Sequence, residues 1–198
     1  MIITIEFMLR FLALSLFALW WFYWRITERQ AEDAKPKKIK KDIYGPALRI
    51  LILMANSILV LQLFGLNLLP MSFSNQILFS MQVSGFLLIV IGMIVAVSAR
   101  KTLGHNWSHA ADYQVKKGQE LVTSGMYSVI RHPIYSGLVV GYIGGELLVQ
   151  SYLVVIGLLM YAGGYYQARL EEKLLQEHYK ESYTLYMRRT KRFIPYLW

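Results

Sequence analysis

Long runs of apolar residues, separated by shorter segments rich in lysine and arginine, dominate the pattern of the chain. The first run extends over residues 2–24, is interrupted by Glu6 and Arg10, and ends in a cluster of tryptophan, phenylalanine and tyrosine. Such clusters are typical of the membrane–water interface, so the run predicts a membrane helix with an aromatic belt. It has neither the basic start nor the small residues at a cleavage site that mark a signal peptide, so we reject that interpretation.

The second run, residues 50–99, contains no Asp, Glu, Lys or Arg. As one helix rising about 1.5 Å per residue it would measure about 75 Å, more than twice a hydrocarbon core of about 30 Å. Turn residues lie at 69–75, so we expect two spans, at about 48–69 and 76–98. The third run, 133–168, is again too long for one span, and we expect a tight hairpin of two helices that turns near Gln150 and Ser151.

The distribution of positive charge tests this count of five spans. Of the 21 lysine and arginine residues, seven lie in 25–41, five in 100–131 and seven in 169–192. The connections near Pro70 and Gln150 contain none. With five spans all three basic segments lie on one side, as the positive-inside rule requires, which places the N-terminus outside and the C-terminus in the cytoplasm. Four or six spans would put a basic segment on the wrong side.

Composition agrees with an all-α integral membrane protein. The 198 residues are 56% hydrophobic and 17% charged, which excludes a disordered chain and an ordinary soluble domain. A formal net charge of +9 indicates an anionic partner, and the hydropathy favours the lipid bilayer over nucleic acid. The lysines of 35–41 are best interpreted as binding lipid headgroups. With no cysteine the chain has no disulfide, thiolate metal site or cysteine nucleophile. We expect no obligate protein partner.

Two cytoplasmic segments, 102–135 and 169–192, hold most of the polar residues that packing does not explain, and we expect the functional site there. The fourth span should begin at Pro133, because the residue before a proline avoids the helical region and proline suits the first helical position. Its first free N–H groups, from Ile134 and Tyr135, then face the cytoplasm. Together with the neighbouring Arg-His pair they form an anion pocket, or that pair only anchors the helix at the headgroups.

Adjacent acids, Glu171 and Glu172, lie at the inner end of the fifth span, where a charge is costly unless it is paired. At least one of them should have a cationic partner: Arg131, Arg169 or a bound ligand. Beyond them, apolar residues recur at a spacing of three to five and predict an amphipathic interfacial helix: Leu170, Leu174, Tyr179, Tyr183 and Tyr186. A solvated charged helix is the alternative for that tail.

Three other features carry less chemistry. His105 and His109 have no evident third ligand, so we expect no metal site. The glycines at 141, 144 and 145 lie inside a span with no preceding strand, and we interpret them as helix-packing glycines. Glu146 is a functional candidate because it is an acid within a span, although it lies near the outer end, where it would face water.

The C-terminal half resembles the isoprenylcysteine carboxyl methyltransferases over roughly residues 100–198, and its length suits a compact prokaryotic member. The motifs that carry the resemblance stand in order: Leu121-Val122-Thr123-Ser124-Gly125-Met126-Tyr127, Arg131-His132-Pro133-Ile134-Tyr135-Ser136-Gly137, Glu171-Glu172 and Arg192-Phe193-Ile194-Pro195. Residues 1–99 would then hold three spans with a basic cytoplasmic loop at 25–46, and residues 100–198 the catalytic half with the hairpin at 133–168.

The resemblance implies S-adenosylmethionine as methyl donor, with S-adenosylhomocysteine as product, in a cytoplasmic pocket at the membrane border. Motif positions imply these cofactor-binding residues: Gln114, Gln119, Glu120, Leu121, Val122, Tyr127, His132, Pro133, Ile134, Tyr135 and Glu171. The segment 132–135 would hold the amino-acid end of the cofactor, and Glu171 suits ribose hydroxyls or the ammonium. Eukaryotic members carry an arginine shortly before the paired acids, where this chain has Gln167 and then Arg169. This departure leaves the acceptor open.

The implied acceptor is a lipophilic, prenylcysteine-like carboxylate that enters laterally from the bilayer. A carboxylate with a pKa of about 3.5 is ionised at neutral pH, so its methylation needs positioning and no general base. The residues expected to act on the acceptor are Arg131, Arg169 and Glu172. The membrane would be the cell membrane in a prokaryote and the endoplasmic reticulum in a eukaryote.

Three alternatives stay open. A phospholipid amine methyltransferase would need a base near Tyr135 or Glu172, because an amine must lose a proton. A membrane sterol reductase would bind a nicotinamide dinucleotide, but those enzymes are longer. A lipid-binding protein without activity would leave the paired acids unexplained.

Overall fold

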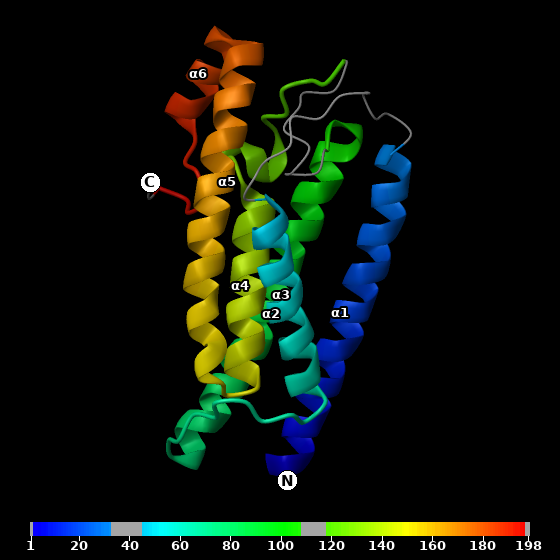
Figure 1. Cartoon of the computed structure of the whole chain (residues 1–198), viewed down its shortest axis with the longest axis vertical. Helices are drawn as coiled ribbons and strands as arrows, with labels where there is room; N and C mark the ends of the chain where they lie inside the picture. The colour runs from blue at the N-terminus through cyan, green and yellow to red at the C-terminus, as the bar shows by residue number, and fades with distance from the viewer. Residues whose placement is uncertain (1, 33–44, 108–117, 197–198) are drawn as a thin grey trace.

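The computed structural model of the chain describes residues 2–32, 45–107 and 118–196. Five long helices run along the long axis of the molecule in alternating directions (Figure 1): α1 Ile2–Glu32, α2 Gly45–Leu63, α3 Asn75–Leu103, α4 Pro133–Leu148 and α5 Ile156–Tyr179. The shorter elements are η1 Gly104–Asn106, η3 Gly125–Ser128, η4 Tyr152–Val155 and α6 Glu181–Arg189. Within those described ranges the architecture is all-helical, as expected, apart from two isolated bridges.

Helix boundaries follow the apolar runs with one clear difference. The predicted start of α4 at Pro133 is confirmed, and so is the hairpin turn, where Gln150 has a positive φ of 57°. In contrast, α2 ends at Leu63, six residues before the expected boundary, because Gly65 adopts a φ of 108° and begins an irregular connection. Two helical stretches, Ile5–Glu28 and Asn75–Asn106, are long and apolar enough to cross a membrane.

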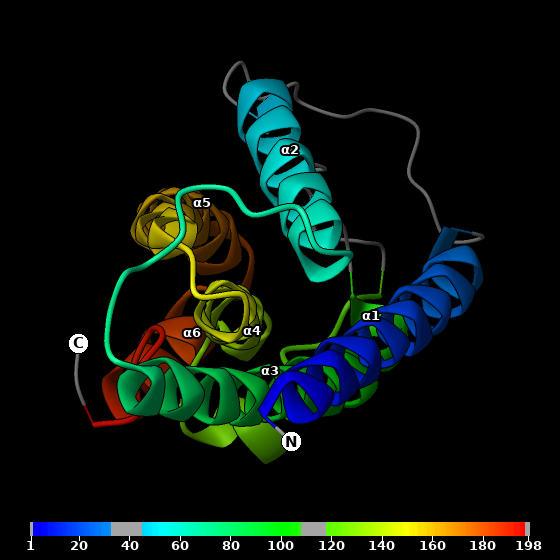
Figure 2. The ribbon, with the colours of Figure 1, turned by 90° about the horizontal axis from the view of Figure 1, so that it is seen from below.

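Helix α4 lies at the centre of the bundle and packs against the other four long helices (Figure 2). Its closest neighbour is α3, and the two backbones meet along a seam of glycines. A Cβ atom on Gly92 would lie 2.5 Å from the carbonyl oxygen of Gly137, and one on Gly144 would lie 2.6 Å from that of Gly85. A side chain cannot fit there, which confirms the packing role of Gly144. A Cβ atom on Gly145 would meet Leu59 of α2 at 2.6 Å, whereas one on Gly141 would meet no atom within 4 Å.

Polar residues inside the bundle are paired near the end opposite α6. Glu6 and Arg10 of α1 form a salt bridge of 2.7 Å, and Arg10 also donates to the backbone oxygen of Gln62 at 2.9 Å. The Gln62 amide donates to Glu146 at 3.3 Å. Glu146 is 0% exposed, so the expectation that it faces water is wrong. Next to it the Ser151 amide donates to the Glu146 backbone oxygen at 2.9 Å, and Ser151 forms an isolated bridge with Pro70.

Helices α5 and α6 divide the predicted amphipathic tail. Lys180, with a φ of 51°, separates them, so the tail bends instead of continuing as one helix. The apolar face of α6 is buried: Tyr183 is 1% and Tyr186 is 8% exposed. That face packs on the protein, and the Tyr186 hydroxyl donates to the Tyr127 carbonyl oxygen at 2.7 Å. The helix is therefore amphipathic as predicted, and its apolar side helps to build the region around α4.

Candidate active site

A segment after α6, which we call the C-terminal strap (residues 190–195), runs beside the chain that enters α4. The Arg131 amide donates to the Lys191 oxygen at 2.8 Å, and the His132 amide donates to the Arg192 oxygen at 3.0 Å. The Ser136 hydroxyl donates to the Phe193 oxygen at 2.8 Å. These bonds fix the start of α4 and bring the end of the chain to the same place.

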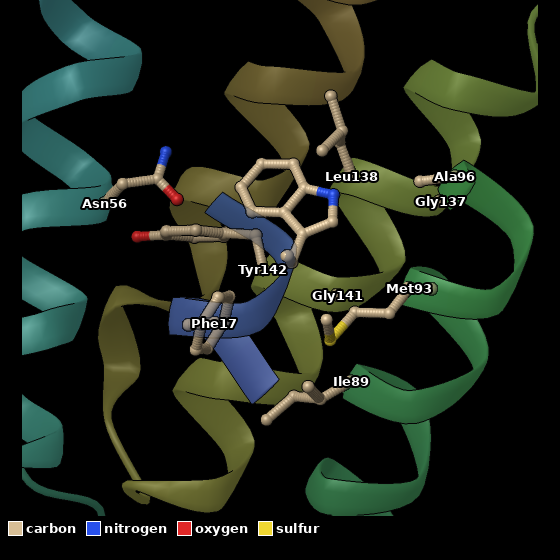
Figure 3. A pocket seen from close by; sticks show the side chains of 11 residues that line it. Phe17, Asn56, Ile89, Met93, Ala96, Gly137, Leu138, Gly141 and Tyr142 are labelled. Atoms are coloured by element: carbon tan, nitrogen blue, oxygen red, sulfur yellow. The ribbon is translucent and has the colours of Figure 1, made fainter. Parts of the chain in front are cut away.

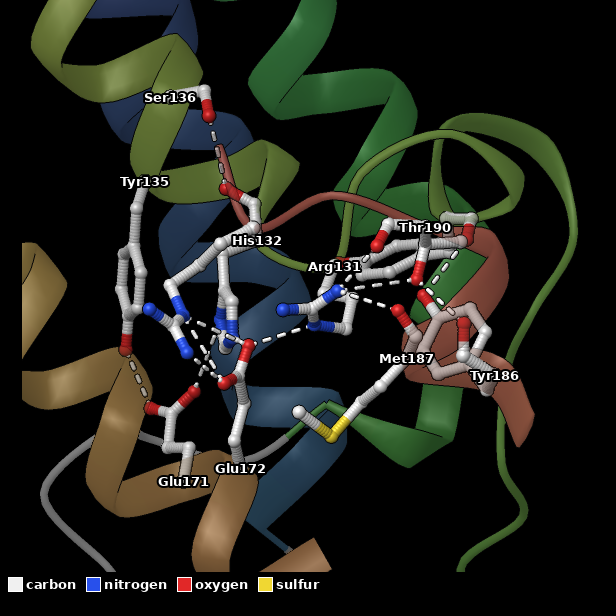
Figure 4. Close-up of polar contacts among 11 residues, drawn as sticks. Arg131, His132, Tyr135, Ser136, Glu171, Glu172, Tyr186, Met187 and Thr190 are labelled. Atoms are coloured by element: carbon white, nitrogen blue, oxygen red, sulfur yellow. Dashed lines mark hydrogen bonds and ion pairs between the residues drawn. The ribbon is translucent and has the colours of Figure 1, made fainter. Parts of the chain in front are cut away.

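The carboxylate of Glu172 is the centre of a buried ionic cluster (Figure 4). Arg131 Nε donates to its Oε1 at 2.7 Å, and Arg192 Nη2 donates to its Oε2 at 2.6 Å. His132 Nε2 lies 3.3 Å from Oε1. The Arg131 guanidinium also donates to the Thr190 backbone oxygen at 2.5 Å, which ties α5, the α4 start and the strap together.

The ionic partners decide the charge of Glu172. Burial alone would raise the pKa of this carboxyl, but the hydrogen bonds from His132, Arg192 and Arg131 hold the pKa well below its usual range. Glu172 is therefore ionised at neutral pH. The expected pairing with Arg131 is confirmed. Arg169 is exposed, and among the described residues no contact joins it to either acid.

Glu171 points to a different set of partners. The Tyr135 hydroxyl donates to Glu171 Oε1 at 2.5 Å, and His132 Nδ1 lies 3.5 Å from Oε2. The Glu171 side chain keeps 25% of its surface exposed, whereas that of Glu172 keeps 4%. Burial raises the pKa of the Glu171 carboxyl, while His132, Tyr135 and Gln167 oppose that rise. Glu172 is thus enclosed by the cluster, whereas Glu171 keeps a quarter of its side-chain surface exposed.

Aromatic rings hold these polar groups in position. The rings of His132 and Tyr135 stack with centroids 5.6 Å apart and an interplanar angle of 3°. Phe193 of the strap packs against both of them, at 5.7 and 6.4 Å. The Arg192 guanidinium lies 4.7 Å from the ring centre of Tyr165 on α5. The strap therefore contributes both a cation and an aromatic wall.

Further predicted cofactor residues lie on the segment 119–127, which hydrogen bonds join to α5 and α6. Leu121 and Val122 are half-buried, and Tyr127 is 6% exposed beneath α6. The segment before them is fixed at two points: the Tyr179 hydroxyl donates to the Gln119 oxygen at 2.7 Å, and the Glu120 amide donates to Asn106 Oδ1 at 2.9 Å. Gln114 lies outside the described residues.

Two features of the site were missing from the expectations. Arg192 was noted only as part of a closing motif, and its pairing with Glu172 depends on the path of the strap. Asn106 carries no motif that signals its bond to Glu120. The Arg-Phe-Ile-Pro motif at 192–195 is the one sequence signal that points to Arg192. No sequence motif points to Asn106.

An apolar pocket begins one turn below the polar cluster, between α1, α2, α3 and α4 (Figure 3). Gly137, Leu138 and Gly141 line it from α4, and Met93 lines it from α3. Three polar groups interrupt the lining: Trp20, Asn56 and Tyr142. The side-chain ends of Asn56 and Tyr142 lie on the α2 side in Figure 3.

Proteins of one kind match this chain in sequence. The protein-S-isoprenylcysteine O-methyltransferase of Xenopus laevis is 28% identical over 119 residues, 59% of this chain and 41% of that protein. The enzyme of the same name from Saccharomyces cerevisiae is 31% identical over 117 residues, 58% of this chain and 49% of that protein. An Arabidopsis thaliana relative, protein-S-isoprenylcysteine O-methyltransferase B, is 25% identical over 115 residues, 57% of this chain and 58% of that protein. The chain thus spans about half the length of these relatives.

The fold has a counterpart among solved structures. A eukaryotic intramembrane Ras methyltransferase, isoprenylcysteine carboxyl methyltransferase, superposes with a TM-score of 0.58 at 19% identity, covering 78% of this chain and 54% of that one. The resemblance inferred from the motifs is confirmed by these matches. The family model described as phospholipid methyltransferase matches residues 80–182, which include α4, α5 with both acids, and most of α3. Because that match covers more than half of the chain, the protein belongs to the phospholipid methyltransferase family.

Proposed function

We propose that this protein is an S-adenosylmethionine-dependent methyltransferase that methylates the carboxylate of a lipophilic, prenylcysteine-like acceptor at the membrane. The observation that carries the proposal is the cluster in which the start of α4, the paired acids of α5 and the strap converge. The names of the most similar relatives support the type of acceptor.

The proposed placement in the membrane is five spans, with the N-terminus outside and the C-terminus in the cytoplasm. The five long helices alternate in direction, so the starts of α2 and α4 lie at the same end of the bundle as the end of α5 (Figure 1). Arg131, Arg192 and the acids gather at that end. The cluster would then face the cytoplasm at the membrane border, where the donor is dissolved and a lipid acceptor is embedded.

The residues at the start of α4 fit the donor by their chemistry. S-adenosylmethionine supplies an activated methyl group on a positively charged sulfur, beside an amino-acid carboxylate and ammonium. The first turn of α4 offers the N–H groups of Ile134 and Tyr135 to a carboxylate, because a helix start leaves such groups without helical partners. The partly exposed carboxylate of Glu171 would accept hydrogen bonds from an ammonium or from ribose hydroxyls.

The protein's own residues would position the acceptor without acting as a base. Arg131 and Arg192 already neutralise Glu172, so an acceptor carboxylate nearby would meet a weakened positive field and keep its nucleophilicity. The catalytic roles predicted for Arg131, Arg169 and Glu172 stay predictions. The buried rings of His132 and Phe193 would exclude water from the reacting atoms.

The apolar pocket below the cluster would receive the chain of the acceptor. It begins at Gly137, one turn from the segment that is proposed to hold the donor, and it is lined mainly by aliphatic and aromatic groups. A lipid that enters between the helices would reach both places without crossing water.

A phospholipid amine is the second acceptor class, and the family description favours keeping it in the test. An amine must lose a proton, and Glu172 is unsuited to accept it because its pKa is held so low. Glu171, with a raised pKa and a partly exposed side chain, is the better base for that chemistry.

The test is isothermal titration of the detergent-purified protein with S-adenosylhomocysteine, with NADPH as the control ligand. Binding of S-adenosylhomocysteine alone would support the methyltransferase, and prenylcysteine acids and phospholipid amines would then be compared as acceptors. Binding of NADPH alone would favour a membrane reductase instead. Binding of neither would favour a lipid-binding protein without activity.

A further inference from the structure

The polypeptide segment at 119–122 has little regular structure, yet the proposed function needs it held still beside the donor. The Asn106 side chain provides one of its two anchors, since its Oδ1 accepts the Glu120 amide at 2.9 Å. Asn106 is 6% exposed and lies on η1, directly after α3. Because the Asn106 side chain is buried, its hydrogen bond fixes the position of the Glu120 amide more firmly than a hydrogen bond to water would.

The turn that carries Asn106 is itself fixed by Arg100. The Arg100 guanidinium donates to the Gly104 oxygen at 3.1 Å, which closes the end of α3 onto η1. It also lies 4.1 Å from the ring centre of Trp107, the residue after Asn106. Arg100 is 3% exposed and Trp107 is 7% exposed, so this stack is shielded from water and contributes more than a surface cation–π contact would.

Arg100 connects the same turn to α1. Its Nη2 donates to the Thr27 backbone oxygen at 2.8 Å, and Trp24 meets Trp107 edge-on with ring centres 5.9 Å apart. A continuous series of contacts therefore runs from the end of α1, through Arg100 and Trp107, to Asn106 and Glu120. Helix α1 carries no motif of its own, and these contacts give its inner end a task in the site.

We propose that Asn106 is a positioning residue for the donor-binding segment 119–122, and that Arg100 holds Asn106 in place by joining η1 to α1. The inference rests on the proposed function, because it assumes that this segment lines the donor site. Neither residue need touch the donor, so both would act through the backbone of Glu120.

The test compares Asn106→Ala with Asn106→Asp. Alanine removes the oxygen that accepts the Glu120 amide, whereas aspartate keeps an acceptor at the same distance along the side chain. We expect Asn106→Ala to weaken S-adenosylhomocysteine binding about three- to tenfold, the effect of one lost hydrogen bond, and Asn106→Asp to restore most of it. Hydrogen exchange of the amides at 119–122 should quicken in the alanine variant and remain slow in the aspartate variant.

A second pair tests the link to α1. Arg100→Lys keeps the charge but loses the planar group that stacks on Trp107 and reaches two carbonyl oxygens, so we expect weaker donor binding and faster exchange at 119–122. Lys101→Gln, at the exposed neighbouring position, is the control and should change neither quantity.

The outcomes separate the two proposals. If the wild-type protein binds no S-adenosylhomocysteine, the proposed function fails first, and this inference fails with it. If the wild type binds but Asn106→Ala binds equally well, or loses thermal stability without losing affinity, Asn106 is merely structural. Equal losses of affinity in the alanine and aspartate variants would also overturn the proposal, because the side-chain oxygen at position 106 would then not determine binding.

Discussion

At the residue scale, the adjacent carboxylates of Glu171 and Glu172 lie in different surroundings because they are one residue apart on a helix. Successive residues on a helix point about 100° apart, so Glu171 and Glu172 reach different neighbours although their backbones are contiguous. Glu172 forms ion pairs with two arginines and is ionised at neutral pH. Glu171 meets Tyr135 and a partly open surface. The division assigns a holding role to one acid and a ligand-facing role to the other.

Replacing Glu171 tests the ligand-facing role. We expect Glu171→Gln to weaken S-adenosylhomocysteine binding by about tenfold or more, because a hydrogen bond to a charged group contributes about 1.5–3 kcal/mol. Titration calorimetry measures the affinity, and the melting temperature in detergent checks the fold. His132→Ala should behave in the same direction, and wild-type affinity in both variants would refute the site.

Replacing Glu172 tests the holding role. Glu172→Gln leaves Arg131 and Arg192 buried without their counter-charge, so we expect a loss of about 3 kcal/mol in the free energy of unfolding. Glu177→Gln, an exposed acid one and a half turns further along α5, is the matched control and should lose little. Thermal or denaturant unfolding in detergent gives the comparison, and equal stability of the two variants would contradict the cluster's role.

The same residue predicts how stability depends on pH. The pKa of Glu172 in the folded protein lies below the unfolded value of about 4.3, so its stabilisation is fully present above that value and is lost as pH falls toward the folded pKa. The difference in melting temperature between wild type and Glu172→Gln should therefore stay constant from pH 6 to 8 and shrink in acid, at about pH 4 and below. A difference that grew on acidification would have the wrong sign.

At the element scale, α3 and α4 approach closely only at positions where glycine leaves room for the backbone of the other helix. An added Cβ on Gly92 meets the Gly137 backbone, but one on Gly141 meets no atom within 4 Å because that position opens onto the apolar pocket. The composition of the span predicted packing glycines as a group. That prediction covered Gly141, Gly144 and Gly145 without distinguishing them and gave no role to Gly92 on α3, since that requires knowing which face of α4 meets α3.

Alanine at each position makes the distinction measurable. We expect Gly92→Ala to destabilise the protein by about 2 kcal/mol through overpacking. Gly141→Ala should leave stability equal or slightly higher, because alanine favours the helix. Melting temperatures of the two single variants in the same detergent decide the matter, and similar losses would mean that the seam also includes Gly141.

At the scale of the whole molecule, apolar runs and the placement of basic residues predicted the five long helices and their order. Lipid forces such regularity, because each backbone group in it must bond within its own helix. The site was only partly predictable. The sequence offered Arg131 as one of three candidate partners of the paired acids, whereas Arg192 reaches the cluster through an irregular strap whose path no periodicity encodes.

The proposed orientation can be measured directly because the natural chain has no cysteine. We expect a single cysteine at Ser72 to react with a membrane-impermeant maleimide added to intact cells. One at Ser182 should react only after permeabilisation. Both positions are exposed, so burial does not protect either. The reverse pattern would invert the orientation, and labelling of both from one side would exclude an odd number of spans between Ser72 and Ser182.

The C-terminal strap also sets an order of events during synthesis. Synthesis runs from the N-terminus, so α1 to α5 are translated before Arg192 and Phe193. Until the strap has emerged, Glu172 lacks its second arginine and the start of α4 lacks its parallel neighbour. If the proposed function holds, the growing chain therefore has no finished donor site. An unfinished chain would compete neither for methyl donor nor for lipid acceptor.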